Sequence, residues 1–187
     1  MVMQSDVLQP PSAWVLRFAP LLPAGGAVLD LACGSGRHLR ALRGRDLRLH
    51  GVDRNASVVE PLRAFATIDV SDLESGPWPY AGVEFDGVIV TNYLWRPLLP
   101  AIVAMIAPGG ILIYETFAMG NETLGSPRNP DFLLRPGELL DAVRPRLRVV
   151  AYEDGRIDLP RPAFVQRICA VRPREDADEG VPAAYNP

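Results

Sequence analysis

One carboxylate and two glycines stand at a spacing that suits nucleotide binding. Residues 28–36 read Val-Leu-Asp-Leu-Ala-Cys-Gly-Ser-Gly, an apolar run that ends in small residues. Gly34 and Gly36 allow the backbone to turn sharply and to approach a ligand closely. Asp53 follows Gly36 by 17 positions, a spacing that accommodates a helix and a strand. A carboxylate at that point can accept hydrogen bonds from both hydroxyls of a ribose.

Strands alternating with helices are predicted to hold these residues in place. An apolar strand over 28–31 leads into the glycine turn, and a helix over 37–43 would point its first amides at a ligand on that turn. A second strand over 48–52 ends at Asp53. Further strands are expected at 64–70, 85–91, 111–117, 147–153 and 163–171, and further helices from Ser12 to Phe18, between Asn55 and Pro61, at 97–107 and at 139–143. The alternation predicts an α/β, Rossmann-like, doubly wound fold.

The order of these pieces resembles the class I S-adenosylmethionine-dependent methyltransferases. The matching motifs are Val-Leu-Asp-Leu-Ala-Cys-Gly-Ser-Gly at 28–36, Gly-Val-Asp at 51–53, Asp-Leu at 72–73, Phe-Asp-Gly-Val-Ile-Val at 85–90 and Ala-Pro-Gly-Gly-Ile-Leu-Ile-Tyr at 107–114. The stretch 115–134 is similar to a bacterial subgroup near the tellurite-resistance-type methyltransferases. The resemblance implies S-adenosylmethionine as cofactor. It also implies a mostly parallel, seven-stranded sheet whose last strand is antiparallel.

The resemblance also places the methionine and ribose ends of the cofactor. The backbone at Gly34 and Gly36 would pass beside the amino acid portion, and Asp53 would hold the ribose. Asp30 would help to fix the ammonium side, although a carboxylate at a strand end can instead serve to cap the turn. The other contacts expected at this end are Ala32, Cys33, Arg54, Thr91 and Asn92, of which Asn92 has an equal claim to be a simple turn residue.

For the adenine end, the resemblance points to Asp72 and Leu73. The Asp72 side chain would accept from the exocyclic amine, and the Leu73 amide would donate to a ring nitrogen. Asp69 is the rival acidic residue, but Asp72 is preferred because Trp78 and Pro79 follow it at a familiar interval. The alternative is that both carboxylates are merely solvated loop residues.

The acceptor end of the site is the least determined by the sequence. Residues 118–135 form a long polar loop after a predicted strand, so this loop is expected to cover the sulfonium end. Arg96 and Arg128 would then favour an anionic acceptor, unless they are solvated or paired with loop carboxylates such as Glu122 and Asp131. No general base stands out, and a thiolate or a metalloid oxyanion would need none. The candidate catalytic residues are Tyr93, Arg96, Glu115 and Arg128.

Composition limits the classes of partner. The 187 residues carry a net charge of −3 and are 48% hydrophobic, which predicts one globular domain over 1–174 and a disordered tail over 175–187. The charge disfavours nucleic acid, and no signal peptide or membrane span is visible, so a cytoplasmic location is expected. No cluster has metal-ligand spacing, so no metal is expected. The sequence leaves the oligomeric state open.

The favoured interpretation is methyl transfer to a small molecule, and three alternatives remain. The arginines between Arg37 and Arg48 could meet the phosphates of RNA, although a solvated helix face is commoner. A nicotinamide-dependent oxidoreductase is disfavoured because Leu39 stands where its fingerprint has a third glycine. An RNA or protein methyltransferase and a non-catalytic cofactor-binding protein share the same core motifs, so fold alone does not separate them from the favoured reading.

Overall fold

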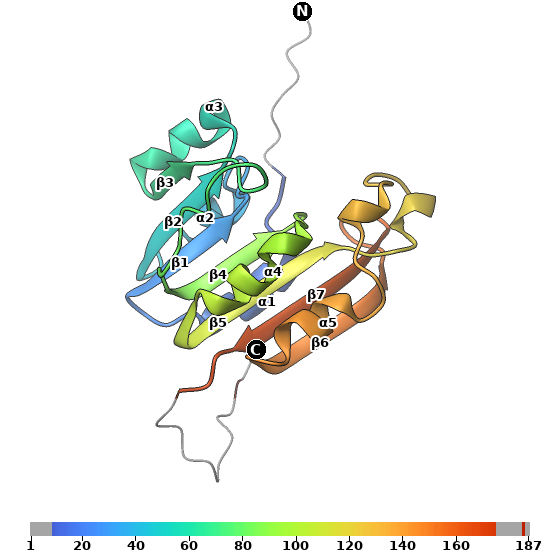
Figure 1. Cartoon of the computed structure of the whole chain (residues 1–187). Coiled ribbons are helices and arrows are strands. Elements are labelled where there is room, and N and C mark those ends of the chain that lie inside the picture. The colour runs from blue at the N-terminus through green and yellow to red at the C-terminus, as the bar shows by residue number, and fades with distance from the viewer. Residues whose placement is uncertain (1–8, 175–184, 186–187) are drawn as a thin grey trace, which may run out of the picture.

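The computed structural model describes residues 9–174 and Tyr185. Its centre is a seven-stranded sheet in the order β3-β2-β1-β4-β5-β7-β6 (Figure 1). The strands are β1 (Gly26–Leu31), β2 (Leu47–Asp53), β3 (Thr67–Val70), β4 (Phe85–Thr91), β5 (Ile106–Phe117), β6 (Arg148–Ile157) and β7 (Ala163–Val171). The first five pair in parallel, and β7 is antiparallel to both β5 and β6. The predicted fold class is therefore confirmed, including the antiparallel last strand.

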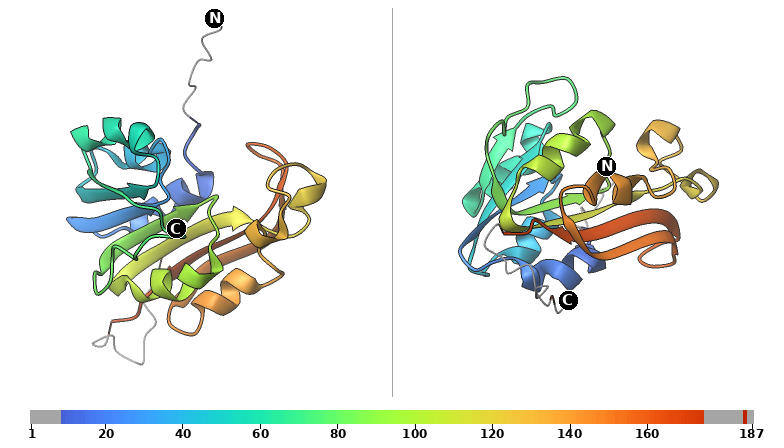
Figure 2. Two further views of the ribbon diagram at one scale, coloured as in Figure 1. Left: turned by 45° about the horizontal axis from the view of Figure 1, so that its top comes forward. Right: turned by 60° about the horizontal axis from the view of Figure 1, so that its bottom comes forward.

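Short helices cover both faces of the sheet (Figure 2). The α-helices are α1 (Ala13–Phe18), α2 (Arg37–Leu42), α3 (Ala56–Val59), α4 (Leu99–Ala104) and α5 (Glu138–Val143), and 3-10 turns occupy Ala19–Leu21, Glu60–Ala64, Arg96–Leu98, Asn121–Thr123 and Pro130–Phe132. One core cluster joins α4 and α5 to the sheet, and the other joins α1, α2 and α3 to its opposite face. Successive residues of β4, such as Val88 and Ile89, belong to different clusters. Because both faces are buried, the central strands are mostly apolar.

Several element boundaries differ from those predicted. The third strand begins at Thr67 rather than at 64, because a 3-10 turn that contains Pro61 continues to Ala64. The helix expected at 97–107 already ends at Ala104. The fifth strand begins at Ile106, ahead of the predicted 111, and its pairing with β4 shifts register in that early part. Propensity alone does not predict such an irregular, bulged strand start.

The carboxyl ends of the parallel strands meet at one edge of the sheet. The strand order reverses between β1 and β4, so this edge contains a topological switch point, where open α/β sheets bind ligands. Ala32 follows β1 with a φ of 55°, and Asn92 follows β4 with a φ of 54°. No other non-glycine residue of the described chain has a positive φ. Strained backbone of this kind collects at functional sites, which directs attention to this edge.

The start and the end of the described chain pack on the face formed with α1. Ser12 caps α1, since its hydroxyl accepts from the Trp14 and Val15 amides. Asn55 precedes α3, but its side chain makes no capping bond. The predicted disordered tail lies outside the described residues except for Tyr185, which packs against this face beside Arg148. No helix among the described residues has the length and apolar character needed to cross a membrane.

Candidate functional site

The two glycines of the first turn are needed for different reasons. Both have positive φ, 51° at Gly34 and 71° at Gly36, which L-residues adopt only with strain. A Cβ at Gly36 would lie 2.5 Å from a Leu62 methyl, whereas a Cβ at Gly34 would meet nothing within 4 Å. Gly36 therefore permits close packing inside the protein. Gly34 faces the open edge, where a ligand can approach the backbone.

Asp53 is held opposite this turn by two backbone amides. Its Oδ2 accepts from the Gly34 amide at 2.9 Å, and its Oδ1 accepts from the Asn55 amide at 2.9 Å. Each carboxylate oxygen keeps a further lone pair for a ligand. The end of β2 and the glycine turn are thus joined through one oriented carboxylate.

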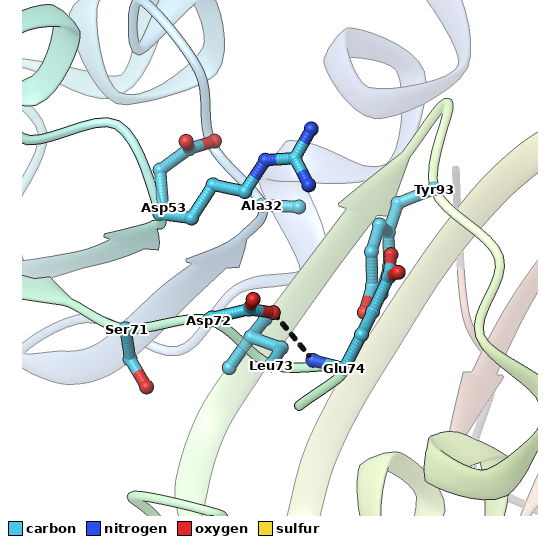
Figure 3. Close-up of a pocket in the computed structure, with 8 residues that line it drawn as sticks. Ala32, Asp53, Ser71, Asp72, Leu73, Glu74 and Tyr93 are labelled. Carbon is cyan, nitrogen blue, oxygen red and sulfur yellow. Dashed lines mark hydrogen bonds between the residues drawn. The ribbon is translucent and has the colours of Figure 1, made fainter. Parts of the chain in front are cut away.

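Asp53 lines a cavity of about 180 Å³, called here the Asp53 pocket. The loops after β1, β2, β3 and β4 form its walls, which consist of Ala32, Asp53, Arg54, Ser71, Asp72, Leu73, Glu74 and Tyr93. Figure 3 shows Asp53 and Asp72 presented by separate strands, with the Tyr93 ring at the side of the hollow. The walls therefore bring together residues expected at the ribose and adenine ends.

The two rival acidic residues after β3 lie in different surroundings. Asp72 lines the Asp53 pocket and accepts from the Ser75 hydroxyl at 2.6 Å and from the Glu74 amide at 2.9 Å. The Ser75 hydroxyl, with the Glu74 and Ser75 amides, lowers the pKa of Asp72, which therefore stays ionised. Asp69 instead accepts from the Tyr80 hydroxyl at 2.8 Å and lines no pocket described here.

Tyr93 contributes an unsatisfied hydroxyl to the wall of the Asp53 pocket. This oxygen is buried and has no hydrogen-bond partner among the described residues. Burial, with the charges of Glu74 and Asp72, raises the pKa of Tyr93, so the phenol is neutral. A buried polar group without a partner costs folding free energy.

A second and larger cavity, of about 340 Å³, opens at the same edge. We call it the Arg37 pocket. It is walled by the segment 9–13, by the ends of β4 and β5 and by the hairpin between β6 and β7. Its lining is Gln9, Pro10, Pro11, Ser12, Ala13, Arg37, Asn92, Glu115, Phe117, Ile157, Leu159, Pro160, Arg161, Ala163, Val165 and Arg167. Asn92 lines this pocket while the next residue, Tyr93, lines the other, so the turn after β4 separates the two.

Among the described residues, the guanidinium of Arg37 bonds only to neutral oxygens. It donates to the Pro10 carbonyl at 3.2 Å and to the Thr91 hydroxyl at 3.3 Å. Burial lowers the pKa of Arg37, although the nearby charges of Glu115 and Asp30 act in the opposite direction. Thr91, expected to contact the cofactor, therefore positions Arg37 and lines neither pocket.

Glu115, a candidate base, is already bound on both sides. Its Oε1 accepts from the Ser12 hydroxyl at 2.9 Å, and its Oε2 accepts from Arg167 at 3.3 Å. Arg167 also donates to Glu153 at 2.6 Å. Glu115 thus joins the segment 9–13 to β7, and both of its carboxylate oxygens already have hydrogen-bond partners.

Asp30 and Cys33 lie behind the glycine turn rather than in a pocket. The Asp30 carboxylate is buried, and its Oδ2 lies 3.6 Å from His38 Nδ1. His38 Nε2 accepts from the Ser12 amide at 3.2 Å, so in the neutral ring the proton sits on Nδ1, toward Asp30. Burial raises the pKa of the Cys33 thiol, which therefore stays protonated. Neither side chain lines a described pocket, and their contact with the cofactor stays a prediction.

The structure places Arg96 and Arg128, expected at the acceptor wall, outside both described pockets. Arg96 forms an ion pair with Glu138 at 2.6 Å and donates to the carbonyls of Asp131 and Leu133, both at 2.7 Å. Arg128 is exposed, and neither arginine lines a described pocket. No residue of 118–135 lines either pocket, because this loop folds against α5 and β7 instead.

The residues that sequence reasoning missed lie mainly in the Arg37 pocket. Arg37 follows Gly36 directly, and that adjacency was the only signal for it. Arg161 and Arg167 come from the β6–β7 hairpin and from β7, and only the fold brings them to this edge. In the described part of the chain, no group of three or more His, Cys, Asp or Glu side chains could hold a metal ion.

The geometry agrees with the comparisons to known proteins. Residues 28–110 match the family described as a methyltransferase domain. This stretch is a methyltransferase domain. The resemblance to the class I S-adenosylmethionine-dependent methyltransferases is thereby confirmed, and S-adenosylmethionine is the cofactor of that family. No curated protein sequence matches the chain.

Solved structures show how widely the whole fold is shared. TehB from Haemophilus influenzae is 17% identical, with a TM-score of 0.71 over 87% of this chain, which spans 62% of the length of TehB. A TehB-like S-adenosylmethionine-dependent methyltransferase from Corynebacterium glutamicum is 16% identical, with a TM-score of 0.61 over 85% of this chain and 86% of the other. The N-methyltransferase NodS from Bradyrhizobium japonicum is 16% identical, with a TM-score of 0.62 over 85% of this chain and 94% of NodS. At these identities the likeness concerns the fold.

Proposed function

We propose that this methyltransferase transfers a methyl group from S-adenosylmethionine to a small-molecule acceptor, using residues 1–174 as one domain. The observation that carries the proposal is that two cavities open at the same edge of the sheet and that consecutive residues, Asn92 and Tyr93, line one cavity each. One cavity would hold the cofactor and the other the acceptor. A methyl group can then pass across a short gap from which water is excluded.

The Asp53 pocket fits the adenosine part of the cofactor. The free lone pairs of Asp53 suit the ribose hydroxyls, and the ionised Asp72 suits the exocyclic amine of adenine. The Tyr93 side chain forms a wall at the side of this pocket. Open space beside Gly34 leaves room for the amino acid portion. Each of these supports the assignment of Asp53, Asp72, Leu73 and Arg54 to the cofactor.

The bound cofactor supplies a methyl group on a positively charged sulfur. The residues of this chain orient the two reactants and exclude water. Asn92 projects into the acceptor pocket from the turn that separates the cavities, so its amide can orient the acceptor beside the sulfonium. No free base lines the Arg37 pocket, since Glu115 is held by Ser12 and Arg167. The site therefore favours an acceptor that is ionised or nucleophilic without deprotonation.

The side walls of the Arg37 pocket support a small acceptor over RNA. The segment 9–13 and the β6–β7 hairpin stand on two of its sides. The arginines that could have formed a basic stripe are dispersed. Arg37 lines the pocket. The guanidinium groups of Arg40 and Arg43 instead lie over the Phe65 ring, 5.9 and 5.0 Å from its centre.

The direct experiment is a methyl-transfer screen with methyl-labelled cofactor. The acceptors are thiols, oxyanions, small phenols and total RNA, and Asp53→Ala is the inactive control. We expect label to enter one of the small-molecule classes and to require Asp53. Label that enters only RNA would contradict the small-molecule acceptor. Absence of cofactor binding would contradict the enzymatic proposal itself.

A further inference from the structure

We propose that the Arg37 pocket selects an organic anion with an apolar body as the methyl acceptor, and that Arg161 binds the anionic group. This inference rests on the proposed function, because it concerns the acceptor of the same reaction. It replaces Arg96 and Arg128, which lie outside the pockets, with a different set of arginines. Three features of the Arg37 pocket support this proposal, namely its charge, its apolar wall and its length.

The charge of the pocket is the first element. Three guanidinium groups, those of Arg37, Arg161 and Arg167, line it against the single carboxylate of Glu115. Glu115 and Glu153 together neutralise Arg167. Arg37 and Arg161 form no ion pair with a described residue, so the lining retains positive charge. A guanidinium binds carboxylate or phosphate oxygens with paired N–H donors, which makes an anion its natural partner.

The apolar wall is the second element. Phe117, Ala163 and Val165 line the same cavity. The prolines of the segment 9–13 line it as well. The Arg161 guanidinium lies 5.7 Å from the centre of the Phe117 ring, so charge and apolar surface adjoin. Leu159, with 82% of its surface exposed, stands at the rim. An acceptor with an apolar body would cover these groups, whereas a bare inorganic oxyanion would leave them in water.

The length of the pocket is the third element. Arg161 precedes β7, which lies two places from β4 in the sheet, and Asn92 follows β4. Neighbouring strands are about 4.8 Å apart, so these two ends of the pocket are separated by roughly 10 Å across the sheet. Arg161 also lies further along the strand direction, because it stands four residues before Val165, the partner of Phe117 at the end of β5. The reacting atom would sit at the Asn92 end, beside the cofactor, and the anionic group at the Arg161 end.

The position of Arg161 also separates two sources of negative charge. Arg37 adjoins the glycine turn, so an anion there could come from the cofactor carboxylate or from the acceptor. Arg161 lies three strand positions from β1, beyond the reach of a cofactor seated at that turn. Its substitution should therefore affect the acceptor alone.

The transfer itself is balanced without a base. With an aryl thiolate, a sulfur lone pair forms the new bond to the methyl carbon while the bond from methyl to sulfonium breaks. The bonding pair stays on the cofactor sulfur, which becomes a neutral thioether, and no proton moves. Aryl thiols ionise readily near neutral pH, which suits a pocket whose one carboxylate is already bound.

The test compares acids with their amides. The probes are 3-(4-mercaptophenyl)propanoate and 3-(4-hydroxyphenyl)propanoate, each with its primary amide. Binding is measured by thermal shift at saturating S-adenosylhomocysteine, and turnover with labelled S-adenosylmethionine. We expect the acids to bind at least tenfold more tightly than the amides and the thiol acid to be methylated. A charge-assisted hydrogen bond is worth that factor.

Variants of exposed arginines provide the controls. Arg161→Gln should reduce the preference for acid over amide to within twofold, Arg161→Lys should restore part of it, and the matched variant Arg128→Gln should leave it unchanged. Affinity for S-adenosylhomocysteine should be the same in all three. Equal binding of acids and amides, failure of both to bind, or an unchanged preference in Arg161→Gln would overturn the inference. Loss of cofactor binding in the parent protein would instead contradict the proposed function.

Discussion

The two pockets differ in charge. Asp53, Asp72 and Glu74 line the first pocket against Arg54, so its walls are mainly acidic. Three arginines line the second against Glu115, so its walls are mainly basic. Both open at the same edge, and one turn, Asn92–Tyr93, divides them.

This difference suggests how the site sorts its two reactants. The proposed cofactor carries a sulfonium, an ammonium and hydroxyl donors, all of which suit carboxylate acceptors. The proposed acceptor is an anion, which the acidic pocket would repel and the basic pocket would attract. The following substitutions test this division between the two pockets, from the largest expected effect to the smallest.

Arg96→Ala should have the largest effect on stability and none on either pocket. It removes the bond to Glu138 and two bonds to loop carbonyls, and it leaves the mostly buried Glu138 carboxylate with the Arg135 amide but without its ion pair. We expect the free energy of unfolding to fall by about 3 kcal/mol, measured by denaturant titration. Cofactor and acceptor affinities of the folded fraction should stay unchanged. If stability were unchanged and acceptor binding were weaker, the result would show that Arg96 contributes to the acceptor site after all.

Gly36→Ala and Gly34→Ala should separate packing from ligand approach. Alanine at either position is strained by its positive φ, and at Gly36 it also meets Leu62. Gly36→Ala should lower stability by about 2 kcal/mol and Gly34→Ala by about 1 kcal/mol. Gly34→Ala should weaken cofactor binding more than Gly36→Ala, because its new methyl group projects into open space. Calorimetric titration would contradict this account if Gly36→Ala bound the cofactor more weakly than Gly34→Ala.

Ala32→Gly should have the smallest effect, and it should be a gain. Ala32 has a φ of 55°, which glycine adopts without strain. We expect the free energy of unfolding to rise by about 0.5–1 kcal/mol, less than the full strain because glycine also gains entropy in the unfolded chain. A melting temperature below that of the parent would show that the Ala32 methyl group contributes more through its contacts than it costs in strain.

The Asp53 pocket could be predicted because its parts follow strands in short motifs. The glycine turn, Asp53 and Asp72 each stand directly after a strand that its own apolar pattern identifies. The preference for Asp72 over Asp69 remains a prediction, and the hydrogen bond from Tyr80 to Asp69 supports it.

The Arg37 pocket could not be predicted in the same way. Its walls come from segments more than a hundred residues apart, such as Ser12 and Glu115. The long loop 118–135 suggested a lid, but Arg96 ties that loop to α5 through carbonyls that no side-chain pattern reveals. Tertiary contacts of this kind depend on the finished sheet rather than on local propensity.

The most direct test of the account is calorimetric titration of S-adenosylhomocysteine into the parent protein, Asp53→Ala and Arg161→Gln. The account predicts binding to the parent and to Arg161→Gln with equal affinity. Binding to Asp53→Ala should be at least tenfold weaker, since charge-assisted hydrogen bonds to the ribose are lost. A nicotinamide dinucleotide should not bind to the parent. Equal affinity for Asp53→Ala and the parent, or tighter binding of the dinucleotide, would contradict the assignment of the cofactor to the Asp53 pocket.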